Sequence, residues 1–194
     1  MKLIAITGGI GSGKSVVARL VQVMGYQVYD CDSKAKSLMV NDEDVKRQLV
    51  ESFGAEVYQA DGTLNRQYLS ALVFADADAL SRLNNIVHPA TARDMMRWAE
   101  EQASTGQKLA FVETAILRTA GLGRFVDSVW HVTAPTDIRI KRVMARSGLT
   151  AEQVRDRIAA QMVEEEIADG ECVIVNDDVT ALLPQVIQLL KLEH

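Results

Sequence analysis

The residues from Gly8 to Ser15 restrict the possible folds of this chain more than any other stretch. They read Gly-Gly-Ile-Gly-Ser-Gly-Lys-Ser and match the pattern G-x-x-x-x-G-K-[ST] of a phosphate-binding loop. An apolar run at residues 2–7 precedes the loop, and apolar residues with helical spacing follow it at 16–24. The chain is therefore predicted to pass from a strand through a glycine-rich turn into a helix, as phosphate-binding loops do.

This context predicts a nucleotide site in which each part of the loop has a role. Lys14 is expected to reach the β- and γ-phosphates and to take part in catalysis, and the Ser15 hydroxyl is expected to bind Mg²⁺. We therefore predict that a nucleotide binds here together with Mg²⁺. The residues predicted to surround the nucleotide phosphates are Gly11, Ser12, Gly13, Lys14, Ser15 and Val16.

Composition narrows the class of protein further. Among 194 residues, 26 are acidic and 21 are basic, which leaves a net charge of −5 and argues against binding to nucleic acid or a membrane surface. No apolar run is long enough for a membrane span, and no signal peptide is indicated, so a cytoplasmic location is expected. Cys31 and Cys172 are expected to be packed side chains rather than disulfide or zinc ligands. No obligatory protein partner is indicated.

Two aspartates stand at the end of a second predicted strand at residues 26–30. On extended backbone, Asp30 and Asp32 would point the same way, toward the carboxyl edge of the sheet, where open α/β folds bind ligands. Aspartate is also a common helix cap, but beside a phosphate loop we favour a functional role. Both are candidates for substrate binding, and Asp32 is also a candidate metal ligand.

Helical patterns fill residues 33–105, and no strand is predicted there. Because about 75 residues separate the second and third strands, far more than a parallel crossover requires, we interpret 33–105 as an acceptor-binding insert. The core would then consist of residues 1–32 and 106–194. His88 is a candidate contact with the acceptor. The expected helices cover 42–52, 66–74, 77–87 and 91–103, with a break at His88-Pro89.

Three further strands are predicted at 109–113, 129–133 and 172–176. Five strands that alternate with helices predict an α/β fold with a parallel sheet covered by helices. Glu113 ends the third strand at the active edge. It could order Mg²⁺ through water or form an ion pair with an arginine.

A basic helix is predicted from Pro135 to Ser147, ended by Gly148. Arg139, Arg142 and Arg146 lie at i, i+3 and i+7, so that their side chains share one helix face. Such a face could clamp phosphate, stack on adenine or form ion pairs in solvent. We favour nucleotide binding, with Arg142 as a catalytic candidate and Arg146 as a nucleotide contact.

The next segment begins with a capping box of Thr150 and Gln153, which predicts another helix. The acidic run from Glu164 to Glu166 is expected to be solvated surface.

Three classes of phosphate-loop protein compete for this pattern. A GTPase needs an N-K-x-D motif and usually a D-x-x-G motif, and neither is present. Motor and transporter ATPases generally have an apolar strand that ends in Asp, whereas here the corresponding strand ends in Glu113. The helical insert and the arginine-bearing helix favour a two-substrate kinase.

A more specific resemblance is carried by Thr7 to Ser15, Asp30-Cys31-Asp32, His88-Pro89, Gln161 and residues 173–176, in that order. The chain resembles the dephospho-coenzyme A kinase family over nearly its whole length. It departs from the family's usual pattern at Cys31, in the segment 112–117 and in the acidic stretch after Gln161.

The resemblance implies a fold like that of nucleoside monophosphate kinases, with a core, an acceptor-binding domain and a lid at about 139–165. It implies transfer of the γ-phosphoryl group of ATP to the ribose 3′-hydroxyl of dephospho-CoA, the last step of coenzyme A biosynthesis. Asp32 would accept or orient the hydroxyl proton, Asp30 would support it, and Asn176 would contact the nucleotide. The alternatives are another kinase for a nucleoside monophosphate or small molecule and, more distantly, a GTPase-like switch.

Overall fold

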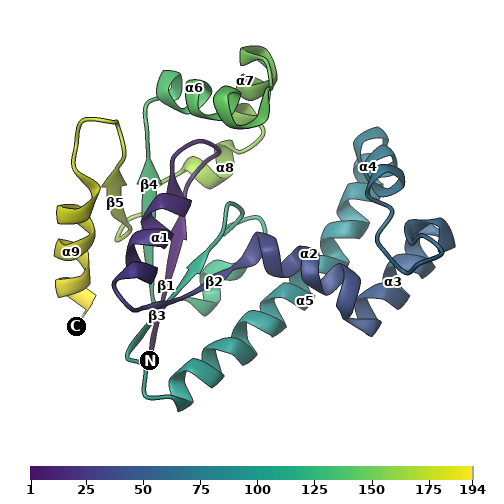
Figure 1. Ribbon diagram of the computed structural model, residues 1–194, viewed down its shortest axis with the longest axis horizontal. Coiled ribbons are helices and arrows are strands. Elements are labelled where there is room, and N and C mark those ends of the chain that lie inside the picture. Colours follow the sequence, from purple (N-terminus) through teal and green to yellow (C-terminus); the bar gives the residue numbers. More distant parts are fainter. Residues whose placement is uncertain (194) are drawn as a thin grey trace. The chain divides into compact units, whose positions relative to one another are not determined.

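The computed structural model describes residues 1–193, apart from the side chain of Glu165, and contains a five-stranded parallel sheet (Figure 1). The strand order is β2-β3-β1-β4-β5, which places β1 in the centre. The chain therefore enters the glycine-rich loop from the middle of the sheet's carboxyl edge, and the predicted fold class is confirmed. The strands are β1 (Lys2–Thr7), β2 (Gln27–Asp30), β3 (Leu109–Glu113), β4 (Ser128–Thr133) and β5 (Cys172–Val175).

The chain divides into two compact units. The sheet unit consists of Met1–Asp30 and Trp98–His194, and the helical unit of Cys31–Arg97. The second boundary falls inside a helix, whereas the sequence suggested a boundary at residue 105, after the last predicted helix.

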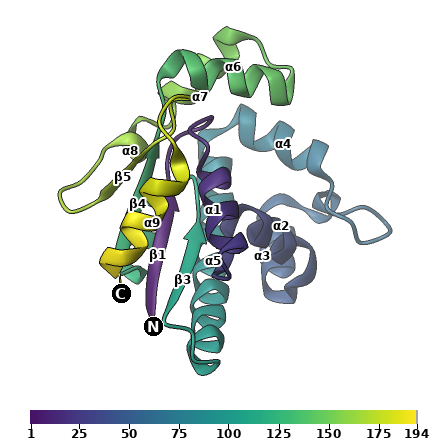
Figure 2. The ribbon, with the colours of Figure 1, turned by 60° about the vertical axis from the view of Figure 1, so that its left-hand side comes forward.

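Helices cover the sheet and approach its carboxyl edge. α1 packs against β1, β3 and α9, while α6 and α7 lie above the carboxyl edge of the sheet (Figures 1 and 2). These helices are α1 (Lys14–Val23), α6 (Thr136–Ser147), α7 (Ala151–Ala159), α8 (Met162–Glu165) and α9 (Leu182–Glu193).

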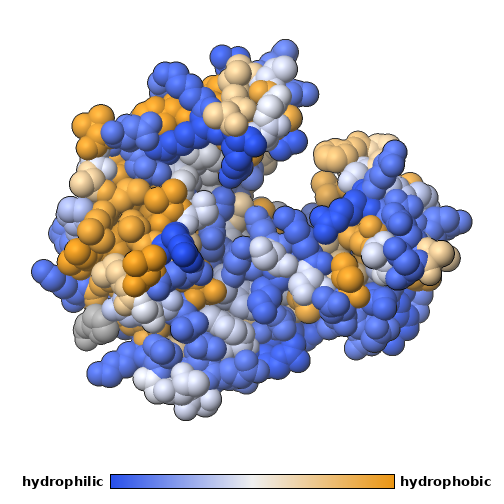
Figure 3. All heavy atoms as spheres, in the orientation of Figure 1, coloured by the Kyte–Doolittle hydropathy of each residue, from blue (hydrophilic) through white to orange (hydrophobic). Residues whose placement is uncertain are grey.

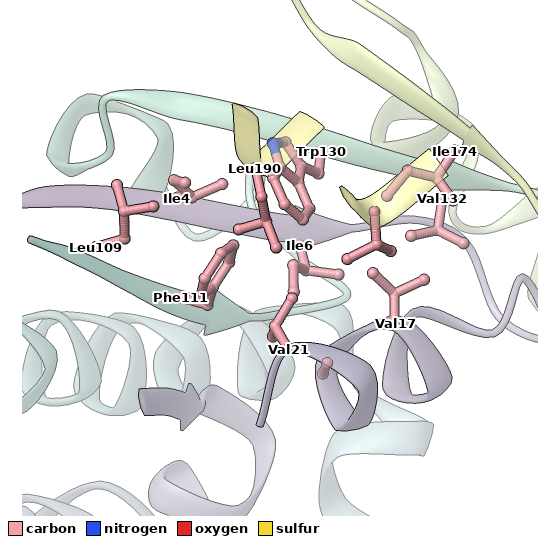
Figure 4. Packing of buried hydrophobic residues seen from close by; sticks show 12 residues of the cluster. Ile4, Ile6, Val17, Val21, Leu109, Phe111, Trp130, Val132, Ile174 and Leu190 are labelled. Atoms are coloured by element: carbon pink, nitrogen blue, oxygen red, sulfur yellow. The ribbon is translucent and has the colours of Figure 1, made fainter. Parts of the chain in front are cut away.

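The core of the sheet unit lies between the sheet, α1 and α9. Phe111 and Trp130 contact each other edge to face, with ring centroids 5.1 Å apart (Figure 4). The apolar face of α1 supplies Val17 and Val21 to this cluster, and α9 supplies Leu190. Burial of these side chains fixes the start of α1, and hence the end of the loop, against the sheet.

The helical unit has a separate core and capped helices. The Asp42 carboxylate accepts hydrogen bonds from the backbone N–H groups of Asp44 and Val45, both at 3.0 Å, and Asn65 caps the next helix. The core includes Val45, Leu49, Phe53, Val57 and Leu69. Its helices are α2 (Cys31–Asn41), α3 (Glu43–Phe53), α4 (Arg66–Ala75) and most of α5 (Ala77–Ser104), with a short 3-10 turn at Ala55–Val57.

The predicted break at His88-Pro89 is wrong, because α5 is continuous through Pro89. Proline removes one backbone hydrogen bond from a helix interior and usually bends or ends it. Here Val87 and Ala90 are buried on either side of the proline. The hydroxyl of Thr91 also donates to the Val87 carbonyl at 2.9 Å, an i−4 bond of the kind that threonine forms within helices. Packing of the apolar face therefore outweighs the local helix-breaking signal.

The outer edge of the sheet is partly closed by a side chain. Gln185 of α9 both accepts from the N–H of Val175 and donates to its carbonyl, each at 2.9 Å. Such pairing blunts an edge strand that could otherwise pair with another chain. Figure 3 shows apolar residues gathered over α1, β5 and α9. The exposed apolar residues of these elements include Val16, Val23, Val173, Val175 and Leu183.

None of the helices in the described part of the chain combines the length and the apolar character needed to cross a bilayer.

Candidate active site

The loop between β1 and α1 adopts a backbone that only glycine accommodates at two points. Gly11 and Gly13 have φ values of 79° and 91°. A Cβ atom on Gly13 would lie 2.0 Å from the amide nitrogen of Asn176, and one on Gly11 would lie 2.7 Å from the Arg139 carbonyl oxygen. The Asn176 side chain and the Arg139 backbone therefore approach these two positions too closely for any side chain, as a phosphate cradle requires.

Side chains from distant segments bind the loop's carbonyl groups. Arg139 Nε donates to the Ile10 oxygen at 2.8 Å, and Asn176 Nδ2 donates to the Ser12 oxygen at 2.7 Å. Arg142 Nη1 lies 3.3 Å from the Gly11 oxygen and 3.4 Å from the Ser12 oxygen. With its carbonyls held from one side, the loop can present backbone N–H groups to an anion on the other.

The three arginines of α6 have different environments. Arg139 is buried and Arg146 is exposed. Arg142 is half-buried, and its guanidinium also donates to both oxygens of Asn176, at 3.1 Å each, and pairs with Asp178. The expected single arginine face is thus divided, because two of its members bind the loop's backbone. The nucleotide-binding roles of Arg142 and Arg146 stay predictions.

Two carboxylates end neighbouring strands at the edge from which the loop emerges. Asp30 and Glu113 are opposite one another in the β2–β3 register, and Glu113 is opposite Ile6 in the β1–β3 register. Both side chains are half-buried. The structure thus places Glu113 and Asp30 at the predicted edge, one strand and two strands away, respectively, from the start of the loop.

Buried hydroxyl groups add polar atoms near the loop. Within the described residues, neither Thr7 Oγ1 nor Ser12 Oγ has a hydrogen-bond partner, although both atoms are buried. Buried hydroxyls normally have a partner, and an unpaired one indicates a functional role or a bound molecule. Ser12 also lines a cavity of about 210 Å³ together with Gly9, Arg139 and residues 131–136.

The extended backbone expected at Asp32 is wrong. α2 begins at Cys31, directly after β2, so Asp32 lies in the first helical turn rather than on extended backbone. An acidic residue is favourable there because it faces the positive end of the helix dipole. Asp32 is exposed, and His88 is half-buried within α5; both belong to the helical unit. Their contacts with an acceptor stay predictions.

The expected exposure of the acidic run is wrong for Glu164. This side chain is 2% exposed, and its carboxylate accepts from the backbone N–H groups of Arg118 at 2.9 Å and Thr119 at 2.7 Å. Glu166 is exposed as expected, and the side chain of Glu165 lies outside the description. Nothing in three consecutive glutamates distinguishes the buried one, because its partners are more than 40 residues away in the sequence.

Gln161 was noted only as part of a family resemblance, yet it contacts the loop directly. Its Oε1 accepts a hydrogen bond from the Ile10 N–H at 2.8 Å. The residues are separated by 151 positions. Only the resemblance, and no local pattern, pointed to Gln161.

The sequence and the fold are similar to those of known proteins. A family model described as dephospho-CoA kinase matches residues 2–181. The chain is 38% identical over 193 residues to dephospho-CoA kinase of Porphyromonas gingivalis, covering 98% of this chain and 94% of the relative. A crystal structure of a Thermus thermophilus protein is 38% identical, with a TM-score of 0.77 and coverage of 98% and 95%. Dephospho-CoA kinase from Campylobacter jejuni, at 20% identity and a TM-score of 0.73 with coverage of 98% and 96%, shows likeness of fold alone.

Proposed function

This chain belongs to the dephospho-CoA kinase family, and we propose that its phosphate loop binds the ATP while the helical unit binds the acceptor. The family's activity, ATP-dependent phosphorylation of dephospho-CoA in coenzyme A biosynthesis, is the activity of this protein. The assignment of ATP to the loop rests on one observation. The loop's carbonyl groups are bound by Arg139, Arg142 and Asn176.

On the nucleotide side, residues Gly11 to Val16 surround the triphosphate and Lys14 places its ammonium group at the transferred phosphoryl. Phosphoryl transfer needs in-line positioning and neutralisation of the charge that is spread over the moving oxygens. Arg146, which is exposed on α6, adds positive charge when α6 and α7 close over the nucleotide. Asn176 and Arg142 contribute by holding the loop and by bordering the nucleotide.

The chain supplies oxygen ligands of the kind that a Mg²⁺ ion arriving with the nucleotide would need. Hydroxyl and carboxylate oxygens are the ligands that Mg²⁺ prefers, and it usually needs only one or two of them besides phosphates and waters. Within the described part of the chain no cluster of three or more His, Cys, Asp and Glu side chains could hold a metal by itself. Ser15 and Asp32 would hold the ion, which when bound neutralises charge on the β- and γ-phosphates.

On the acceptor side, Asp32 accepts or orients the proton of the ribose 3′-hydroxyl of dephospho-CoA. An exposed carboxylate in a first helical turn can act as a general base once a substrate hydroxyl lies within hydrogen-bond reach. Asp30, at the end of β2, supports this group, and His88 contacts the acceptor. A cytoplasmic location stays a prediction, supported by the need for ATP.

The direct test supplies purified protein and MgATP with different acceptors. Dephospho-CoA, AMP, CMP and shikimate are compared with a reaction that has no acceptor, and both ADP release and product mass are followed. We expect dephospho-CoA to gain one phosphoryl group far faster than the others, with the new phosphate on the 3′-oxygen. Faster phosphorylation of AMP or CMP would assign a nucleoside monophosphate as the acceptor. Hydrolysis of ATP without transfer would contradict the kinase assignment.

A further inference from the structure

The peptide groups on both sides of Ile10 are fixed by side chains from outside the loop. Gln161 Oε1 accepts from the Ile10 N–H, and Arg139 Nε donates to the Ile10 oxygen, each at 2.8 Å. Arg139 lies on α6, whereas Gln161 lies between α7 and α8. The direction of the backbone at the middle of the loop is therefore set by two segments that are remote in sequence.

Gln161 presents its oxygen from a well-anchored position. Its own backbone N–H donates to the Ile158 oxygen at 3.0 Å, and its carbonyl accepts from the Glu164 N–H at 2.9 Å. Glu164 is in turn bound to the backbone N–H groups of Arg118 and Thr119. We call residues 161–171 the strap.

The far end of the strap is anchored as well. The Glu171 carboxylate binds the Arg118 guanidinium at 2.8 Å and lies 3.3 Å from Nδ1 of His131, which is buried in β4. Arg118 also donates to the Glu166 carbonyl. Both ends of the strap are thus bound to other parts of the sheet unit, which anchors the segment that carries Gln161.

The loop needs such external contacts because of its composition. Four of the six residues from Gly8 to Gly13 are glycines, which lose the most backbone freedom when they are ordered. Within the loop, the Ser12 N–H donates to the Gly9 oxygen at 3.1 Å. If the loop is already ordered in the free protein, the entropy cost of ordering it does not reduce the free energy of nucleotide binding.

We propose that Gln161 is a positioning residue that preorganises the phosphate loop for the triphosphate through the Ile10 peptide. This rests on the proposed role of the loop as the ATP site. Gln161 acts through the loop and does not itself contact the reacting atoms. The phosphate-dependent part of nucleotide affinity should therefore depend on the oxygen of Gln161, whereas affinity for the nucleoside part should not.

The test compares the same change, glutamine to methionine, at positions 161 and 153. Gln161→Met keeps the length of the side chain but removes the acceptor oxygen from Ile10. Gln153→Met is the matched control, because Gln153 Oε1 also accepts a backbone N–H, that of Thr150 at 2.9 Å, but this bond stays within the capping box of α7. For each protein, amide exchange at Ile10, dissociation constants for ATP and adenosine, steady-state kinetics with dephospho-CoA and the unfolding midpoint are measured.

We expect Gln161→Met to speed amide exchange at Ile10 and to raise the dissociation constant for ATP by about five- to tenfold, as loss of one hydrogen bond implies. Its dissociation constant for adenosine should stay within about twofold of wild type on the same basis. Gln153→Met should leave Ile10 exchange and the ATP-to-adenosine affinity ratio unchanged, even where it lowers the unfolding midpoint.

Unchanged Ile10 exchange or unchanged ATP affinity in folded Gln161→Met would overturn the proposal. An equal loss of ATP and adenosine affinity would also overturn it, since that would indicate general disruption of the site. These outcomes are distinct from failure of the proposed function, which would appear as a lack of dephospho-CoA phosphorylation in the wild-type protein.

Discussion

The sheet unit and the helical unit hold their polar groups in place by different means. In the sheet unit, the phosphate loop is bound by side chains far away in sequence, with separations of 164 residues for Asn176 and 151 residues for Gln161. In the helical unit, hydrogen bonds are shorter in range: Tyr58 donates to the Met39 carbonyl 19 residues away, and Tyr68 to the Phe53 carbonyl 15 residues away.

Because of this difference, we expect substitutions in the two units to have different effects on catalysis and on stability. A loop whose shape depends on β5, α6 and the strap is correct only when the whole sheet unit is folded. The caps and tyrosine hydrogen bonds of the helical unit stabilise individual helices and turns. Changes at the loop should therefore affect turnover strongly with little loss of stability, while changes at the caps should do the reverse.

The largest effect is expected for Lys14→Ala in the sheet unit. Removing a main positive charge at the transferred phosphoryl group should lower kcat by about a thousandfold or more, because such groups stabilise charge that develops in the transition state. The unfolding midpoint should change little, since Lys14 is only partly buried at the start of α1. Steady-state kinetics and thermal unfolding check both statements. Turnover close to wild type would show that the loop is not the catalytic phosphate site.

Asp32→Asn extends the comparison to a functional residue of the helical unit. Loss of a general base typically costs about a hundredfold to ten-thousandfold in kcat. KM for ATP should stay within about twofold if the acceptor hydroxyl, rather than the Mg²⁺ ion, is the main partner of Asp32. Asp44→Asn is the control, since Asp44 is exposed on α3 and pairs with Arg47. If ATP affinity collapses while saturated turnover survives, Asp32 serves the metal rather than the acceptor.

Arg142→Ala tests whether holding the loop's carbonyls matters for nucleotide binding. Its contacts with Gly11, Ser12 and Asn176 would be lost, and we expect KM for ATP to rise about tenfold, as for loss of charge-assisted hydrogen bonds. Limited proteolysis of the wild type provides a second measurement. Nucleotide should protect residues 147–150 if α6 and α7 close over it. Equal cleavage with and without nucleotide would indicate a fixed surface helix.

Asn65→Ala should give the opposite pattern from the loop variants. The Asn65 side chain accepts from the Tyr68 N–H at 3.2 Å and caps α4, and loss of such a cap costs about 1 kcal/mol of unfolding free energy. Denaturant unfolding measures this loss, and Asn65→Ser, which can still cap, is the control. A large fall in kcat below the unfolding transition would contradict the separation between the two units.

The smallest effect is a pH dependence that comes from Tyr58. Burial, followed by the negative charge of Glu43, raises the pKa of Tyr58 from 10.0 to about 12. Between these values the unfolded chain loses its proton first, so the contribution of Tyr58 to stability is present below pH 10 and is lost as the pH rises toward 12. The difference in unfolding free energy between wild type and Tyr58→Phe should therefore change across this range. A difference that is constant with pH would exclude a raised pKa.

Local chemistry in the sequence determined the parts of the protein that depend on neighbouring residues. The strand, glycine loop and helix at residues 2–23, the helix that begins at Arg66 and the capping box of Thr150 and Gln153 were all predicted and are present. The five parallel strands followed from apolar runs that alternate with helical patterns. Within each strand, helix and capping box the residues are close together in the chain, so their spacing carries the information.

Where long-range packing or hydrogen bonding competes with a local signal, only the tertiary structure decided the outcome. Pro89 breaks an isolated helix, but burial of Val87 and Ala90 keeps α5 continuous. Glu164 is one of three adjacent glutamates, and its carboxylate is buried where it accepts from the backbone N–H groups at 118 and 119. Arg139 and Arg142 share a helix face, yet carbonyls of the phosphate loop determine what they bind. These outcomes depend on partners brought together by the folded sheet unit and the folded helical unit, which no local spacing encodes.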